Sequence, residues 1–388
     1  MVTGRVREMT EKTMAEEKKP RYRIDSYLDW VKGEGVPIVE NYGIDLFAVQ
    51  TQAWPRFGMK GAACHLKGRG DFASMFLYEL PPGSSSTPVK HLYEEVTYVL
   101  DGTGSTQLEF PDGAKRSFEW GARSLFAIPL NAKHRHFNGS GQKRALMVST
   151  TNMPLVMNLF HNEKFIFNTE APFTDRIGKD EYYSGEGDLV LVRQGSHMWE
   201  TNFVPDLEQL GLQAYEARGA NSANIKFVLA DSSMHAHISE MPPGTYKKGH
   251  RHGPGAHVMC VVGTGYSLLW FEGEKDFLRI DWKHGVVFPP ADRQLHQHFN
   301  TSNRNARYLA TNVGGIRYPF TAASRRTGGE EGDELGATAR SVKDGGDQIE
   351  YEDQDARIHL LWLAEMKKNG GKVDPVMFKW FPEKAAAE

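Results

Sequence analysis

Residues 134–138 read HRHFN, and residues 296–300 read HQHFN. The second pentapeptide follows the first at an offset of 162 residues. Three shorter matches precede this pair in the same order at an offset of 161: PPG at 81–83 and 242–244, GTG at 102–104 and 263–265, and LEF at 108–110 against LWF at 269–271. Four ordered matches at nearly one offset indicate that the chain contains two copies of one module.

Each copy predicts β-structure. Short runs rich in aromatic and β-branched residues alternate with Pro and Gly, as in an antiparallel sandwich or barrel. These runs are FASMFLYEL (72–80), EVTYVLDG (95–102), SLFAIPL (124–130), HVMCVVGTGYSLLWF (257–271) and GVVFPP (285–290). Helical periodicity is expected only outside the copies, in a short helix within 26–37 and in an amphipathic helix that begins at Asp355 and ends at Gly370. The predicted fold class is all-β, with two barrels in one chain.

Composition and charge limit the kind of protein. A chain of 388 residues predicts about two domains. The formal net charge of -3 gives no reason to expect nucleic acid or an anionic membrane as a partner. The apolar runs fall far short of the ~20 residues that cross a bilayer, and residues 1–20 lack the apolar segment of a secretory signal. With only two cysteines, the sequence favours a cytoplasmic protein without a disulfide framework.

Histidines gather in residues 249–257, GHRHGPGAH. His250 and His252 point to one face of a strand, because side chains alternate, and His296 can join them inside a small barrel. This pattern resembles the cupin superfamily, whose motifs run Gly-x5-His-x-His-x(3 or 4)-Glu-x6-Gly and Gly-x5-Pro-x-Gly-x2-His-x3-Asn. The resemblance covers residues 70–150 and 231–316 and implies a bicupin with two jelly-roll barrels.

The two copies depart from the motifs in different ways. In the second copy, His257 is interpreted as the residue at the glutamate position, whereas the following residues match: Gly244, His250, His252, His296 and Asn300. In the first copy Val89 replaces the first histidine, whereas the following match: Gly83, His91, Glu95, Gly102, Pro129, His134 and Asn138.

The resemblance implies a metal site on His250, His252 and His296. His257 is expected either as a fourth ligand or as a hydrogen-bond partner of a ligand, and the sequence leaves open whether His296 or His298 binds the metal. In the first copy His136 stands two positions beyond His134 in the same way. Imidazoles without thiolate favour iron, zinc, copper, nickel or manganese. In the first copy His91, Glu95 and His134 form a weaker second candidate site, or a remnant in a barrel kept for structure.

A ligand set of imidazoles alone resembles the gentisate 1,2-dioxygenase-like cupins. That resemblance implies Fe(II), O2 and a small anionic substrate, namely a hydroxylated aromatic or enolisable carboxylic acid. The candidate catalytic residues are His257, His298 and His237, with His235 beside His237. Tyr266, Trp270, Arg279 and Arg293 are candidates for an aromatic wall and a carboxylate clamp, or are ordinary packing residues.

Two other functions stay open at this point. One is a non-oxidative cupin enzyme, a decarboxylase, lyase or isomerase that uses Mn, Ni or Zn as a Lewis acid. The other is a non-enzymatic bicupin for small-molecule binding or storage. We expect a homo-oligomer in either case.

The expected domain boundaries follow from the repeats. They are a disordered tail (1–20), an N-terminal extension that packs on a barrel (21–69), the first barrel (70–175), an inter-barrel connection (176–230), the second barrel (231–320), a flexible linker (321–349) and a C-terminal helical tail (350–388).

Overall fold

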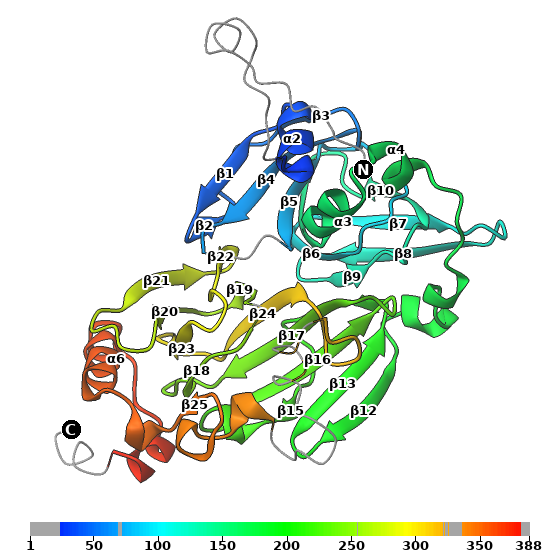
Figure 1. Cartoon of the computed structure of the whole chain (residues 1–388). Coiled ribbons are helices and arrows are strands. Elements are labelled where there is room, and N and C mark those ends of the chain that lie inside the picture. Colours follow the sequence, from blue (N-terminus) through cyan, green and yellow to red (C-terminus); the bar gives the residue numbers. More distant parts are fainter. Residues whose placement is uncertain are drawn as a thin grey trace, which may run out of the picture.

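The computed structural model describes residues 24–68, 72–253, 255–320, 322, 325 and 336–381. Two β-barrels lie one above the other, the first in blue to cyan and the second in green to yellow (Figure 1). The all-β prediction with two jelly-roll barrels is confirmed. The expected tail at 1–20 and most of 321–335 lie outside the described residues.

The first barrel consists of an eight-stranded and a three-stranded sheet. Its strands are β1 (Ile38–Asn41), β3 (Gln52–Trp54), β4 (Met59–Leu66), β5 (Ser74–Leu80), β6 (Glu95–Asp101), β7 (Thr103–Glu109), β8 (Lys115–Gly121), β9 (Leu125–Ala127), β10 (Lys133–Asn138), β11 (Ala145–Thr151) and β14 (Phe203–Val204). The larger sheet has the order β1-β4-β5-β11-β6-β9-β14, with β3 paired to β4, and the smaller has the order β10-β7-β8.

The second barrel repeats this plan with a nine-stranded and a five-stranded sheet. Its strands are β2 (Ile44–Asp45), β12 (Asp188–Arg193), β13 (Ser196–Thr201), β15 (Gln213–Ala214), β16 (Ala223–Leu229), β17 (Met234–Met241), β18 (Gly249–His250), β19 (His257–Val262), β20 (Thr264–Trp270), β21 (Leu278–Lys283), β22 (Val286–Phe288), β23 (Leu295–Asn300), β24 (Ala306–Val313) and β25 (Gln348–Ile349). The larger sheet has the order β12-β13-β16-β17-β24-β19-β22-β2, with β15 paired to β16, and the smaller has the order β21-β20-β23-β18-β25.

The repeated pentapeptide occupies β10 in one barrel and β23 in the other. The asparagine at its end joins this strand to neighbouring backbone segments. The Asn300 side chain donates to the backbone carbonyls of Met241, Pro242 and Arg304 at 2.9–3.1 Å, and Asn138 makes the three equivalent bonds in the first barrel. These bonds satisfy buried carbonyls, so the residue is needed in both copies.

The second glycine of the repeated Gly-Thr-Gly stands where a paired strand and a tryptophan ring approach closely. A Cβ atom at Gly265 would lie 2.0 Å from the carbonyl oxygen of Phe299 and 2.5 Å from the Trp282 ring. Gly104 meets Phe137 and Trp120 in the same way. Only glycine fits there, which explains why the tripeptide recurs.

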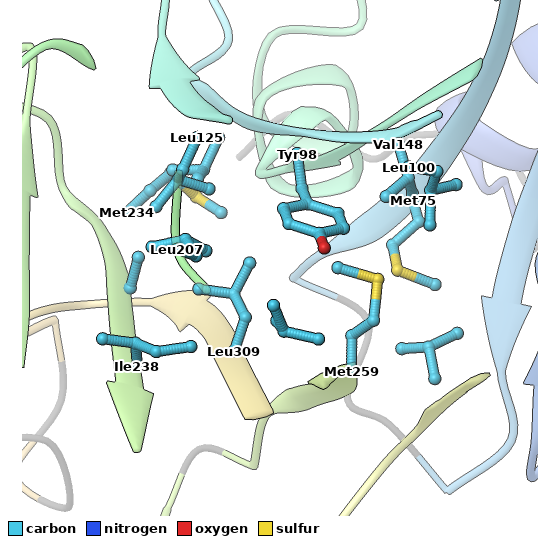
Figure 2. Packing of buried hydrophobic residues seen from close by; sticks show 14 of the residues in the cluster. Met75, Tyr98, Leu100, Leu125, Val148, Leu207, Met234, Ile238, Met259 and Leu309 are labelled. Atoms are coloured by element: carbon cyan, nitrogen blue, oxygen red, sulfur yellow. The ribbon is translucent and has the colours of Figure 1, made fainter. Parts of the chain in front are cut away.

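The two barrels share a core and exchange short strands. Buried apolar side chains from the larger sheets of both barrels form one cluster, in which Tyr98 and Val148 of the first face Met259 and Leu309 of the second (Figure 2). β2 from the N-terminal extension pairs with β22 of the second barrel, and β14 pairs with β9 of the first. Each barrel therefore carries a strand from the other's part of the sequence.

The segment expected as a connection, 176–230, holds β12, β13, β15 and β16, which belong to the second barrel's larger sheet. The physical reason is that the sheet extends beyond the repeat, because β16 pairs with β17 along its length. The described part of the expected linker, 336–349, is also structured, with two short helical turns and β25 paired to β18.

Helices cover the barrels from outside. The predicted short helix is α2, and the predicted amphipathic helix is α6, which begins after the cap Asp355 and packs Ile358, Trp362 and Met366 on its own second barrel. Two helices that the sequence pattern did not predict, α3 and α4, follow β11 of the first barrel. The bounds are α2 Ser26–Gly33, α3 Met153–Phe160, α4 Glu163–Asn168, α6 Ala356–Lys368, and the 3-10 turns η1 Thr174–Arg176, η2 Asp180–Tyr183, η3 Glu216–Arg218, η4 Ala337–Ala339, η5 Val342–Asp344, η6 Tyr351–Asp353 and η7 Pro375–Lys379.

Candidate metal centre and its cavity

Three histidines meet inside the second barrel. His250 ends β18 and pairs directly with His296 on β23, and His252 follows two residues after His250. One ring nitrogen from each of the three lies within 4.8 Å of the others. The ring centres of His250 and His296 are 4.0 Å apart, and those of His252 and His296 are 4.9 Å apart. The predicted trio is thus brought together.

The backbone orients these rings for a metal. The Nδ1 of His296 donates to the carbonyl of Gln294 at 2.9 Å, and that of His250 faces the carbonyl of Lys248 at 3.4 Å. Because a carbonyl only accepts, the proton sits on Nδ1 and the Nε2 lone pair stays available. Burial lowers the pKa of both rings well below the usual range, so both are neutral donors.

His298 lies beside the cluster rather than in it. Its Nδ1 is 2.7 Å from the Ser267 hydroxyl, which also accepts from the Trp282 indole at 3.0 Å. In the first barrel His136 Nδ1 lies 2.8 Å from the Thr106 hydroxyl, which accepts from the Trp120 indole at 3.0 Å. Between the two histidines that the sequence left open, the structure groups His296 with the trio and leaves out His298.

The interpretation of His257 as the residue at the glutamate position is wrong. Strand pairing sets Thr150 opposite Val96 in the first barrel and Thr311 opposite His257 in the second. His257 therefore corresponds to Val96, and Ala256 corresponds to Glu95. His257 lines a cavity of about 10 Å³ between the barrels, because a shift of one residue on a strand turns a side chain to the opposite face.

The offset of 161 that relates Gly102 to Gly263 also relates Glu95 to Ala256. The sequence repeat alone therefore indicates that Ala256, not His257, stands at the glutamate position. The second barrel consequently offers three imidazoles and a methyl group where the motif has a carboxylate.

The first barrel has the carboxylate that the second lacks, but one histidine fewer. His91, Glu95 and His134 bring their ligand atoms within 4.8 Å, with His91 Nε2 3.3 Å from the Glu95 carboxylate. Burial raises the pKa of Glu95, but the hydrogen bond and charge of His91 outweigh it and hold the pKa at about 2. Val89 occupies the place opposite His134 that His250 occupies opposite His296. The cavity here is about 10 Å³ and is lined partly by Phe57, Met59 and Tyr78.

A larger cavity of about 110 Å³ opens over the second cluster. Its wall carries three basic side chains, Arg193, Arg218 and Lys226, and no Asp or Glu lines it among the described residues. The histidine pair expected there is present: His235 Nε2 lies 3.0 Å from His237 Nδ1, and burial lowers the pKa of both. His298 lines the same cavity.

The motifs did not predict this basic wall, because its residues lie before the second repeat, on β12, η3 and β16. The arginines that were suggested as a clamp have other partners. Arg279 binds Asp281 and Glu365, and Arg293 binds Asp347. No motif spacing in the sequence distinguishes the cavity residues Arg193 and Arg218 from Arg279 and Arg293.

The segment 336–349 closes one side of the cavity. Thr338 lines it, and Arg218 donates to the Thr338 carbonyl. Further along, β25 pairs with the strand that carries His250. Asp347, which is 2% exposed, receives two hydrogen bonds from Arg293 at 2.8 and 2.9 Å and one from Arg251 at 3.3 Å. This segment braces the metal cluster.

The chain thus folds as two jelly-roll barrels that carry ligand clusters in equivalent positions. Similar solved structures include an oxalate decarboxylase of Lactobacillus farciminis in complex with formate, at 14% identity and a TM-score of 0.48, covering 71% of this chain and 87% of that chain. A deletion mutant of Bacillus subtilis oxalate decarboxylase matches at 12% identity and a TM-score of 0.46, covering 71% and 78%.

No family model matches the sequence, and no curated protein matches it. Within the described residues, no helix combines the length and apolarity that a membrane crossing requires.

Proposed function

We propose that the second barrel is the active site of a metal-dependent enzyme that acts on a small anionic molecule, with Fe(II) as the metal and O2 as co-substrate. The observation that carries this proposal is the combination of three imidazoles, His250, His252 and His296, with a cavity wall that, among the described residues, carries basic side chains and no carboxylate. Bound Fe(II) would supply redox chemistry between O2 and a hydroxylated aromatic or enolisable carboxylic acid.

The donor set fits a divalent first-row metal. The hydrogen bonds to carbonyls fix His250 and His296 with Nε2 facing the cluster, as metal-binding histidines require. Because Ala256 supplies no carboxylate, the ligands leave the metal charge uncompensated. An anionic substrate would be drawn there and to Arg193 and Arg218.

The remaining side chains have proposed roles in binding and proton transfer. Arg218 and Arg193 would hold the substrate carboxylate. His298 and His237 line the cavity and are the groups proposed to hold or move a proton near the substrate. His257, which faces the space between the barrels, is not proposed for either role.

A non-oxidative reaction is the second candidate. Two imidazoles beside the cluster, His237 and His298, suit a decarboxylation, lyase or isomerase reaction in which a Lewis acid such as Mn, Ni or Zn activates the substrate and protons move. We also expect a homo-oligomer, which light scattering would test.

Metal analysis and oxygen uptake test the proposal. We expect metal bound to the purified protein to be lost in His250→Ala and retained in the control His161→Ala, which removes an exposed histidine outside the site. O2 consumption with Fe(II) and a panel of hydroxybenzoates supports the first candidate. Iron without O2 uptake, but with anaerobic turnover under Mn, Ni or Zn, supports the second, and equal metal content in both variants contradicts the site.

A further inference from the structure

A lysine amine lies in the wall of the large cavity, apart from the histidine cluster. Lys226 stands on β16, and its side chain shares a face with Asn224, two residues before it. Its Nζ donates to the Ser196 hydroxyl on β13 and lies 5.4 Å from the centre of the Tyr215 ring. Its partner across the strand pair is His237. The amine is thus held at one place in the cavity.

The surroundings of Lys226 disfavour a positive charge. Arg193 and Arg218 line the same cavity, the facing imidazoles His235 and His237 are neutral, and no described carboxylate faces the amine. Burial, with further contributions from the two guanidinium groups, lowers the pKa of Lys226 to about 7. About half of the molecules therefore carry a neutral amine near pH 7, with its lone pair free.

Two polar atoms in this wall also have no hydrogen-bond partner within the part of the chain that the structure describes. The amide oxygen of Asn224 and the Nε of Arg193 are buried without a hydrogen bond among the described residues. Buried polar groups ordinarily have partners, so an unsatisfied acceptor and donor around one amine indicate a bound polar ligand.

We propose that Lys226 is a nucleophilic amine that forms an imine with the carbonyl group of a small oxo acid. The Nζ lone pair would form a bond to the carbonyl carbon, and the carbonyl π pair would move to oxygen, which takes the amine proton. A second proton from solvent would then let water leave, giving a protonated imine. This cation would stand beside Arg193 and Arg218, so the substrate must bring its own carboxylate.

The substrate class is therefore a 2-oxo or 3-oxo carboxylic acid. Imine formation would make the lysine an electron sink for reactions at the adjacent carbon. This activity goes beyond the metal chemistry proposed above, because it needs no ligand of the histidine cluster.

Reductive trapping tests the inference. Protein as purified, and protein treated with a chelator, is incubated at neutral pH with pyruvate or glyoxylate and sodium cyanoborohydride, and the modified lysines are identified by peptide mass spectrometry. Relative to an ordinary lysine, a pKa near 7 raises the neutral fraction by about 10³, part of which is offset by lower nucleophilicity. We expect Lys226 to be modified at least about 10-fold faster than any other lysine.

Lys247 is the internal comparison, because it is buried, its pKa is also lowered, and it does not line the cavity. Lys226→Arg removes the nucleophilic amine and keeps a long basic side chain, and circular dichroism checks its fold. Modification confined to exposed lysines, or equal modification of Lys226→Arg, overturns the inference. Metal content measured in the same samples reports separately on the histidine cluster.

Discussion

Replacing Asp347 by Asn should lower both the stability of the protein and its affinity for metal, although Asp347 is not one of the three candidate ligands. The carboxylate is 2% exposed and binds both Arg251, which lies between His250 and His252, and Arg293, which precedes His296 by three residues. The backbone NH of Arg293 donates to the His252 carbonyl at 3.0 Å, and that of Arg251 donates to the Asp347 carbonyl at 3.0 Å. Asp347 therefore acts as a positioning residue.

The size of the effect follows from exposure. A hydrogen bond to a charged group contributes about 1.5–3 kcal/mol, and three are present. The Arg293 side chain is 41% exposed and Arg251 also binds Glu272, so water and Glu272 would take over part of the loss. We expect a loss of roughly 2–3 kcal/mol in the free energy of unfolding. Metal affinity should fall by about 10-fold, because Arg251 and Arg293 would no longer hold the segments that carry the three histidines in place.

Urea unfolding and titration with Zn(II) measure the two effects. The matched control is Asp344→Asn, an exposed carboxylate in the same segment. If Asp347→Asn unfolds and binds Zn(II) like Asp344→Asn, the bracing role is refuted and segment 336–349 is only a cover.

Three further predictions concern other parts of the fold. Val89→His supplies the missing imidazole of the first barrel, so Zn(II) titration in a His250→Ala background should show at least about 10-fold tighter binding; unchanged binding contradicts the equivalence of positions 89 and 250. Burial and Arg123 hold the pKa of His284 at about 4, so unfolded chains take up a proton that the native state excludes. Stability should therefore fall between about pH 6.5 and 4, and less steeply in His284→Gln, as urea unfolding across that range will show. Trp362→Ala should cost about 3–5 kcal/mol in urea unfolding, since the ring is fully buried under α6, whereas Leu360→Ala at an exposed position should cost little.

The features that the sequence predicted correctly are those in which one residue type has one physical task. Asn300 must reach three carbonyls, and Gly265 must leave room for the Phe299 carbonyl and the Trp282 ring, so both recur at a nearly constant offset. The trio of histidines shares this property, because strand pairing sets His250 opposite His296. Positions of this kind predict both the two barrels and the histidine cluster.

The sequence predictions were wrong or incomplete where the place of a side chain depended on strand alternation, or where a cavity residue lies in a segment without a motif. Reading His257 one residue out of register moved it from the space between the barrels into the site. Arg218 and Lys226 reach the cavity because β16 and η3 extend the second barrel's wall, and nothing in their local sequence distinguishes them from Arg279 on the surface.

The two barrels carry different parts of one ligand set. The first has the Glu95 carboxylate beside its two imidazoles, and it has Val89 where the second barrel has a histidine. Its cavity, which is lined partly by aromatic side chains, is only about 10 Å³. The second keeps three histidines and has Ala256 instead of the carboxylate, in a cavity of about 110 Å³ with a basic wall. A substrate anion would take over in the second barrel the charge balance that Glu95 provides in the first. Ala256→Glu should therefore weaken anion binding even where it strengthens metal binding, and an anion affinity that is unchanged in this variant would contradict the division of roles.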